Sequence, residues 1–166
     1  MNYKPKNMWI VDFEGLDRSG KSTTKVALAK RLNQYVLCND RGTLSLEAYD
    51  KRYARNNFTF QAADYIIAYP FHLIAYHYCS KEDFEKRKAD TNHEDIDFEF
   101  DTKCFLEALE NHRKHGALIV ALNTSELSTE ECVDKILEIM QKYEKLYNLH
   151  GLGVKKWNSK IRKLGR

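Results

Sequence analysis

Residues 13–23 read FEGLDRSGKST and contain the spacing G-x-x-x-x-G-K-[ST], which runs from Gly15 to Ser22. The residues before the motif, MWIVDF at positions 8–13, are mostly apolar and predict a buried strand. After the motif, apolar residues recur at helical spacing between positions 26 and 32. A strand, a glycine-rich turn and a helix in this order are the context in which such a motif carries chemistry.

That chemistry is phosphate binding, and the motif is known as the P-loop. Its glycines let successive backbone N–H groups turn toward a phosphate, at the positive end of the following helix. Lys21 can reach the terminal phosphates, and the Ser22 hydroxyl is placed to bind Mg²⁺. The alternative is a glycine-rich turn without a ligand. The sequence predicts that a nucleoside triphosphate is bound by Gly15, Leu16, Asp17, Arg18, Ser19, Gly20, Lys21, Ser22 and Thr23.

The composition is that of an ordinary globular domain. The chain has 166 residues and a net charge of +3, which suits anionic small substrates and does not by itself favour nucleic acid as a partner. The four cysteines are scattered without a C-x-x-C pair and predict reduced thiols in the core. We see no signal peptide and no apolar run near the roughly 20 residues that span a bilayer, so we expect no membrane partner and a cytoplasmic location.

The rest of the chain alternates apolar runs with amphipathic segments. The predicted strands are residues 8–13, 35–39, 72–78 and 117–122. The predicted helices are residues 21–33, 44–56, 59–69 and 97–114, with two more beginning at Ser80 and at the capping box of Ser128. Strands joined through helices imply a parallel sheet with helices on both faces. We therefore expect an α/β protein with a three-layer P-loop NTPase fold and a mostly parallel sheet of about four strands.

The domain organisation follows from the same pattern. Residues 1–153 are predicted to form a single kinase-like domain, with a lid-like loop at about residues 90–96. Residues 154–166 form a basic tail that carries six Lys or Arg residues and no acid. This tail could touch a polyanion, but basic termini are common without such a role, so nucleic acid is not favoured as a partner. The sequence leaves open whether the protein forms a homodimer.

A second group of polar residues, Asp40 and Arg41, ends the second predicted strand. Because the carboxyl ends of parallel strands share one edge of a sheet, both should face the P-loop. Asp40 could hold a water on Mg²⁺ or accept a proton, and Arg41 could bind a phosphate with two hydrogen bonds. The alternative is a solvated turn whose charges do no chemistry. The predicted metal site is therefore Ser22 with Asp40.

The stretch FEGLDRSGKSTT resembles the P-loop of thymidylate kinases, which typically read F-E-G-x-D-x-x-G-K-S-T. Asp40-Arg41, followed by Ser45 and Ala48-Tyr49, is similar to the D-R-Y-x-x-S-x-x-A-Y segment of that family. The order of the later elements is also similar, so the resemblance extends from residue 8 to about residue 145. It implies a shortened nucleoside monophosphate kinase that uses ATP and Mg²⁺.

The resemblance also implies roles for single residues. Asp17 would reach toward the acceptor sugar, Asp40 would serve the metal and Arg41 would bind the acceptor phosphate. Some members carry an arginine inside the P-loop that neutralises the transferring phosphoryl group, and others carry it in the lid. The predicted lid contains no Arg or Lys, so Arg18 takes this role. The catalytic residues expected are Arg18, Lys21, Asp40 and Arg41.

Two departures from the family leave the acceptor open. The strand–helix unit that normally precedes the D-R segment is absent, and the tyrosine of D-R-Y is Gly42 here. A deoxynucleoside monophosphate is the favoured acceptor. The alternatives are a kinase of another small metabolite or of a nucleic-acid end, and an ATP-dependent switch without phosphoryl transfer. The chain has no N-K-x-D segment of the kind that reads guanine in GTPases.

Two further segments could take part in binding. Arg87, on the helix before the predicted lid, could swing onto phosphates or form a solvated ion pair. Residues 123–125 follow the last predicted strand and could contact the nucleotide base. The tyrosines at positions 76 and 78 are predicted to fill the interface between sheet and helix rather than to stack on a base.

Overall fold

The computed structural model describes residues 2–39, 71–88, 96–114 and 118–149. The predicted helices at 44–56 and 59–69, the D-R segment with Asp40 and Arg41, residues 90–95 of the predicted lid and the basic tail lie outside these residues.

A parallel sheet forms the centre of the described fold. Its strands lie side by side in the order β2-β1-β3-β4, and each neighbouring pair is parallel. The strands are β1 (Trp9–Glu14), β2 (Val36–Asn39), β3 (His72–Tyr78) and β4 (Leu118–Asn123). The predicted α/β class and the four predicted strands are thereby confirmed, because each strand begins and ends within one residue of its expected position.

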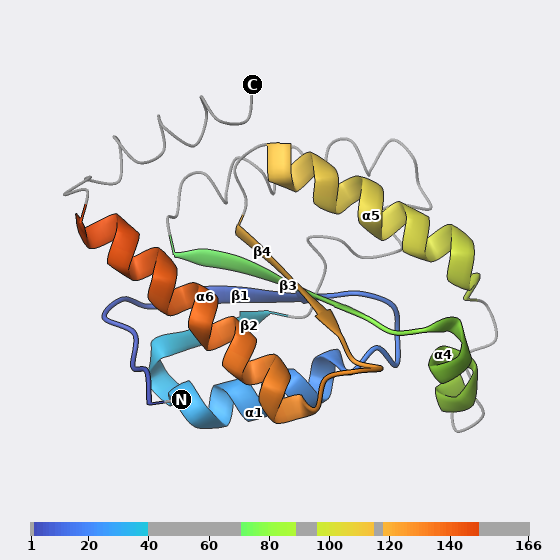
Figure 1. Ribbon diagram of the computed structural model, residues 1–166, viewed down its shortest axis with the longest axis horizontal. Coiled ribbons are helices and arrows are strands. Elements are labelled where there is room, and N and C mark those ends of the chain that lie inside the picture. The colour runs from blue at the N-terminus through green and yellow to red at the C-terminus, as the bar shows by residue number, and fades with distance from the viewer. Residues whose placement is uncertain (1, 40–70, 89–95, 115–117, 150–166) are drawn as a thin grey trace.

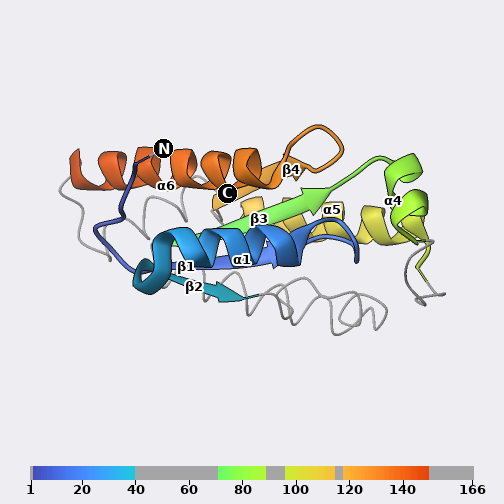
Figure 2. The same ribbon diagram turned by 90° about the horizontal axis from the view of Figure 1, so that it is seen from below.

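Helices cover both faces of this sheet (Figures 1 and 2). They are α1 (Lys21–Leu32), the short 3-10 turn η1 (Asn33–Tyr35), α4 (Lys81–Lys88), α5 (Phe98–Lys114) and α6 (Thr129–Leu149). Figure 2 shows α1 in front of the sheet and α5 behind it. Strand, helix and strand succeed one another along the chain, as the alternation of the sequence predicts.

Two apolar clusters fill the space between these layers. On one face, alternate residues of β1 such as Trp9, Val11 and Phe13 pack with the apolar sides of α1 and α6. On the other face, Ile74 and Tyr76 of β3 pack with α4 and α5. Successive residues of a strand point to opposite faces, so both sets of positions are apolar when both faces are covered. This double burial explains why the strands read as nearly continuous apolar runs.

The predicted capping box fixes the start of α6. The Glu131 backbone N–H donates to Ser128 Oγ at 3.3 Å, and the Ser128 backbone N–H donates to Glu131 Oε2 at 2.8 Å. Each of the two side chains therefore accepts a hydrogen bond from a backbone N–H group at the start of the helix. This cap sets where the chain turns after β4.

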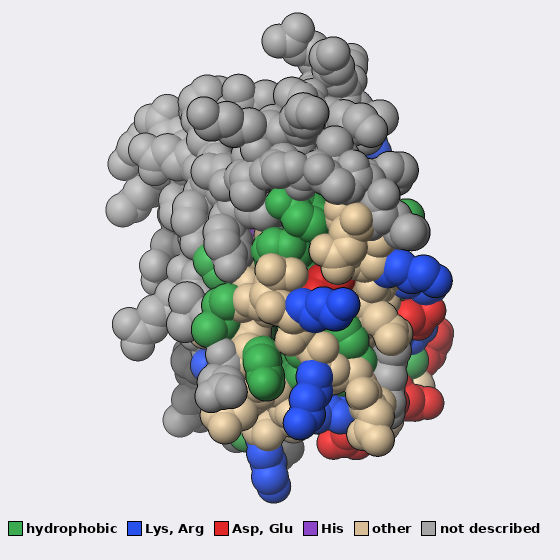
Figure 3. Space-filling model, turned by 90° about the vertical axis from the view of Figure 1, so that its left-hand side faces the viewer, with side chains coloured by type: hydrophobic (Ala, Val, Ile, Leu, Met, Phe, Trp, Pro, Cys, Tyr) green, Lys and Arg blue, Asp and Glu red, His purple; other side chains and the backbone are tan. Residues whose placement is uncertain are grey.

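The first residues of the chain are tied to α6 by one carboxylate, that of Glu144. This side chain is 4% exposed and accepts hydrogen bonds from Tyr3 Oη, Trp9 Nε1 and the backbone N–H groups of Lys6 and Asn7. Burial alone would raise the pKa of Glu144, but these hydrogen bonds outweigh it and lower the pKa below the ordinary carboxyl value. Figure 3 shows this end of the molecule, where Lys and Arg side chains are spread over the described surface.

We expect Glu144→Gln to reduce the free energy of unfolding by about 2–3 kcal/mol at pH 7, because the amide loses the charge and cannot accept from every donor. A lowered folded-state pKa contributes stability above the ordinary carboxyl pKa, and this contribution disappears as the pH falls through the lowered value. The difference between the wild type and the variant should therefore shrink in acid. Urea unfolding across this pH range measures it.

Glu138→Gln is the matched control for that experiment. Glu138 lies on the same helix, its side chain is 52% exposed and its carboxylate forms an exposed ion pair with Lys142. We expect this change to alter the free energy of unfolding by less than about 0.5 kcal/mol. Equal losses in the two variants would contradict the role assigned to Glu144.

Candidate functional site

The motif loop, residues 15–20, joins the carboxyl end of β1 to α1. Gly15 has a φ of +132° and Gly20 a φ of +91°, and both values are strained for residues with a side chain. A Cβ built on Gly15 would lie 2.0 Å from the carbonyl oxygen of His77 on β3, so the loop packs directly against the neighbouring strand. The first backbone N–H groups of α1 come from motif residues. Such groups have no carbonyl partner within their own helix and can donate to a ligand.

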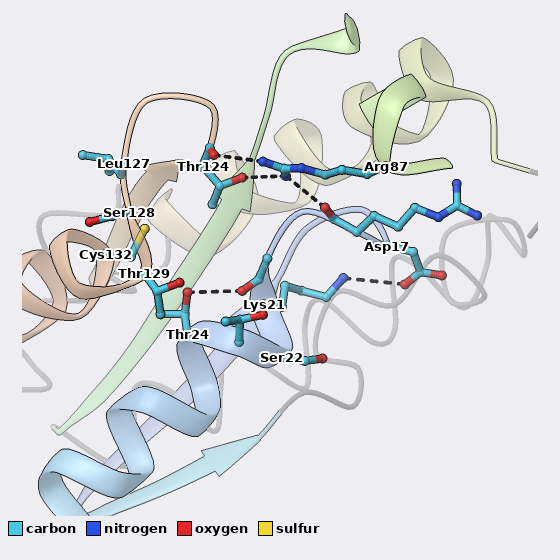
Figure 4. Close-up of a pocket in the computed structure, with 13 residues that line it drawn as sticks. Asp17, Lys21, Ser22, Thr24, Arg87, Thr124, Leu127, Ser128, Thr129 and Cys132 are labelled. Carbon is cyan, nitrogen blue, oxygen red and sulfur yellow. Dashed lines mark hydrogen bonds and ion pairs between the residues drawn. The ribbon is translucent and has the colours of Figure 1, made fainter. Parts of the chain in front are cut away.

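Lys21 bends back over this loop (Figure 4). Its Nζ donates to the carbonyl oxygens of Gly15 and Leu16, the second at 2.8 Å. The same nitrogen lies 3.7 Å from the Asp17 carboxylate, and the lysine side chain is 17% exposed. The ammonium group is therefore held above the motif loop, where its charge can act on a bound anion.

A cavity of about 520 Å³ opens beside Lys21. One wall is the motif, and the other comes from α4, the segment after β4 and the start of α6. The predicted site residues that line it are Asp17, Arg18, Gly20, Lys21, Ser22 and Thr23. Leu16 and Ser19 line a different cavity, and their predicted part in nucleotide binding stays a prediction. The volume lies within the range of small-molecule sites.

Arg87 joins the two walls. Its guanidinium donates to the Arg18 carbonyl oxygen at 3.0 Å, to Thr124 Oγ1 at 3.1 Å and to the Thr124 carbonyl oxygen at 2.9 Å. Figure 4 shows Arg87 extending from α4 to Thr124 across the rim of the cavity. The sequence suggested that Arg87 either binds a phosphate or forms a solvated ion pair. In the structure its hydrogen bonds connect α4 to the loops after β1 and β4.

Arg18 has a special backbone and a defined side-chain contact. Its φ is +65°, which is uncommon for a residue other than glycine. Its guanidinium carbon lies 5.9 Å from the ring centroid of Phe84, a buried residue of α4, within reach of a cation–π contact. The predicted role of Arg18 on a transferring phosphoryl group stays a prediction.

A buried histidine, His77, lies under the motif. Burial lowers its pKa to about 4, the hydrogen bond with the Ala75 carbonyl acts in the opposite direction, and the charge of Lys21 lowers it further. The ring is therefore neutral at pH 7 and lies beside that of Phe13, with centroids 5.7 Å apart. A neutral imidazole here adds no positive charge to that of Lys21.

Several lining residues were not identified from the sequence. They are Thr24, Leu127, Ser128, Thr129 and Cys132. The rule that ligands bind beyond the carboxyl ends of parallel strands points to the segment after β4, but it does not indicate which side chains face inward. Burial raises the pKa of the Cys132 thiol, Glu131 raises it further, and Lys135 and Thr24 lower it.

The predicted metal site is described only in part. Ser22 is exposed at the first turn of α1 and lines the cavity, whereas Asp40 lies outside the described residues. Within the described ranges, no group of three or more His, Cys, Asp or Glu side chains could hold a metal ion. A hydroxyl oxygen such as that of Ser22 is a suitable ligand for Mg²⁺, which usually keeps several waters.

The fold and the cavity define an α/β protein with a parallel sheet and a cavity beside the loop after its first strand. No protein-family model matches the chain, and no curated protein or solved structure is significantly similar to it. Among the helices that are described, none has the length and apolar character that crossing a membrane requires.

Proposed function

We propose that this protein has the P-loop NTPase fold and transfers the γ-phosphoryl group of ATP to a nucleotide or nucleoside, with a deoxynucleoside monophosphate as the favoured acceptor. The observation that supports this most is the position of Lys21. It follows two glycines with positive φ, lies above the loop between them and borders a cavity large enough for a nucleotide. The P-loop spacing in the sequence supports the same proposal.

The cavity provides complementary parts for the two ends of ATP. Lys21, Ser22 and Thr23 line the part of the cavity at the positive end of α1, which would take the phosphates. Thr124, Leu127 and Ser128 form a wall with hydroxyl groups and an apolar side chain, which suits a sugar and a base. ATP bound in this direction points its terminal phosphate toward the motif loop.

The transfer would proceed by one displacement. An acceptor oxygen forms a bond to the γ-phosphorus while the bond from that phosphorus to the β–γ bridging oxygen breaks, and ADP leaves with the electron pair. Negative charge spreads over the three equatorial oxygens, where Lys21 and Arg18 stabilise it. Arg41 would hold the acceptor, and Asp40 would take the proton when the acceptor oxygen is a hydroxyl.

Magnesium fits the oxygen donors of this motif. Ser22 with Asp40 would hold the ion, which when bound offsets the charge of the phosphates. Of these two ligands, Ser22 lies within the described residues, and its hydroxyl is exposed at the first turn of α1.

An assay of ADP formation tests the proposal. The protein is incubated with ATP, Mg²⁺ and each deoxynucleoside or deoxynucleoside monophosphate in turn, and ADP release is followed by a coupled reaction. We expect one acceptor to raise ADP release well above the rate with ATP alone. ATP binding without stimulation by any acceptor would overturn the transfer step and favour the ATP-dependent switch, while no ATP binding would overturn the whole proposal.

A further inference from the structure

A second cavity of about 410 Å³ lies against the same motif loop. Leu16 and Ser19 line it, whereas Asp17, Arg18 and Gly20 of the same loop line the first cavity. The two cavities therefore share the motif loop as a common boundary. A molecule in the second cavity would lie one loop away from a phosphate held by Lys21.

The walls of the second cavity are mostly apolar and aromatic. None of its lining residues in the described part of the chain is Lys, Arg, Asp or Glu. The rings of Tyr76 and Tyr78 are stacked at 5.7 Å between centroids and 18° between planes, and Phe98 of α5 adds a third aromatic side chain. Flat apolar walls of this kind favour an uncharged planar ring.

Two residues of the lining, His77 and Tyr76, are ionisable but neutral at pH 7. His77 borders the cavity, but its ring packs against Phe13, which belongs to the cluster on the opposite face of the sheet. The hydroxyl of Tyr76 is neutral at pH 7, since burial raises its pKa to about 12, with smaller contributions from Tyr78 and Cys79. Neither residue therefore introduces a charge into the cavity.

One hydroxyl in the loop wall of this cavity, that of Ser19, has no hydrogen-bond partner among the residues that the structure describes. Ser19 is 1% exposed, and its Oγ makes no hydrogen bond with any described residue. Buried polar atoms in proteins are nearly always hydrogen-bonded, so this atom points to a group that a ligand would supply. Ser19 belongs to the loop wall of the second cavity and does not line the first.

We propose that the second cavity binds the ring of the acceptor, an uncharged planar heterocycle of the nucleobase type, with a polar atom of the ligand bonded to Ser19 Oγ. This inference rests on the proposed function, because the transfer requires ATP in the first cavity. Leu16 and Ser19 border this cavity, so an acceptor whose ring lies between Tyr76 and α5 would have the motif loop beside it. Because none of the lining residues within the described ranges is charged, we place the ring, not the reacting group, in this cavity.

Binding experiments on the whole chain test this assignment. Thymidine, deoxycytidine, deoxyadenosine and deoxyguanosine are titrated separately by calorimetry, with and without a non-hydrolysable ATP analogue. Ala121→Phe fills the cavity from β4, beside Tyr76 on the neighbouring strand, and Leu106→Arg places a charge at its α5 side. We expect at least one nucleoside to bind the wild type and each variant to bind it at least tenfold more weakly, with affinity for the ATP analogue unchanged.

Lys103→Ala is the matched control on α5, since its side chain is 73% exposed and does not line the cavity. It should bind nucleoside as the wild type does. Leu106 is 52% exposed, so Leu106→Arg should melt close to the wild-type temperature and keep the test valid if Ala121→Phe does not fold. Wild-type affinity in Leu106→Arg, or no binding of any nucleoside to the wild type, would overturn the inference.

The same measurements separate this inference from the proposed function. Acceptor-dependent ADP release that neither variant alters would overturn the ring site and leave the kinase standing. Nucleoside binding that both variants weaken, in a protein that binds no ATP, would overturn the kinase and leave the ring site as a binding site. Lys21→Ala should bind the ATP analogue more weakly than the wild type and bind the nucleoside as the wild type does.

Discussion

Lys21→Ala should lower the kcat of ADP formation by about 10²–10³-fold in the coupled assay. The reason is that its ammonium group lies above the motif loop, where the γ-phosphate would gain charge as its bond to ADP breaks. Alanine leaves the loop glycines and α1 in place. It removes the ammonium group that donates to the carbonyl oxygens of Gly15 and Leu16. Affinity for ATP should fall less than kcat, because the charge is larger in the transition state.

Lys30→Ala is the control for this variant. Lys30 is exposed in the last turn of α1, at the opposite end of the same helix, and does not line the cavity. Its kcat and its melting temperature should remain those of the wild type. If Lys21→Ala releases ADP as fast as Lys30→Ala, the ammonium group has no part in the transfer.

Much of the fold could be predicted because it depends on local patterns. The apolar runs at 72–78 and 117–122 are bounded by polar turns, and the structure begins and ends β3 and β4 within one residue of them. The capping box at Ser128 set the first residue of α6 in the same way. Parallel pairing then follows, because each described strand is preceded or followed by a helical segment. Such a segment carries the chain back to the edge of the sheet where the next strand begins.

The far wall of the first cavity could not be predicted, because it depends on contacts between residues distant in the chain. Arg87 and Thr124 are 37 positions apart, and nothing local to Arg87 distinguishes a bond to Thr124 from a solvated ion pair. The buried pair formed by Asp12 and His72 was missed for the same reason, since the partners lie on neighbouring strands and 60 positions apart.

The sequence also could not predict which residues of the motif loop line which cavity. The spacing G-x-x-x-x-G-K-[ST] predicts which residues surround a phosphate, but it does not tell which of them face away. Leu16 and Ser19 line the second cavity, whereas Asp17, Arg18 and Gly20 line the first, and the loop has positive φ at Gly15, Arg18 and Gly20. The cavity proposed for the acceptor ring is therefore visible only in the three-dimensional structure.

Gly15→Ala should reduce the free energy of unfolding by about 3–5 kcal/mol. The new Cβ would lie 2.0 Å from the carbonyl oxygen of His77, and neither of these groups is the flexible end of a side chain. The φ of +132° adds strain for any residue with a Cβ. Relief requires β1 and β3 to separate at their carboxyl ends, where the motif loop begins. Urea unfolding measures this loss without any assumption about the ligand.

Gly20→Ala provides the comparison within the same loop. Its φ of +91° is also strained, but the nearest atom to a new Cβ is the Thr124 methyl carbon at 3.3 Å, which can move. We expect a smaller loss of about 1–2 kcal/mol. A Gly15→Ala protein that is as stable as Gly20→Ala would mean that the loop does not pack against the His77 carbonyl. The loop wall between the two cavities, to which Leu16 and Ser19 belong, would then lie elsewhere relative to β3.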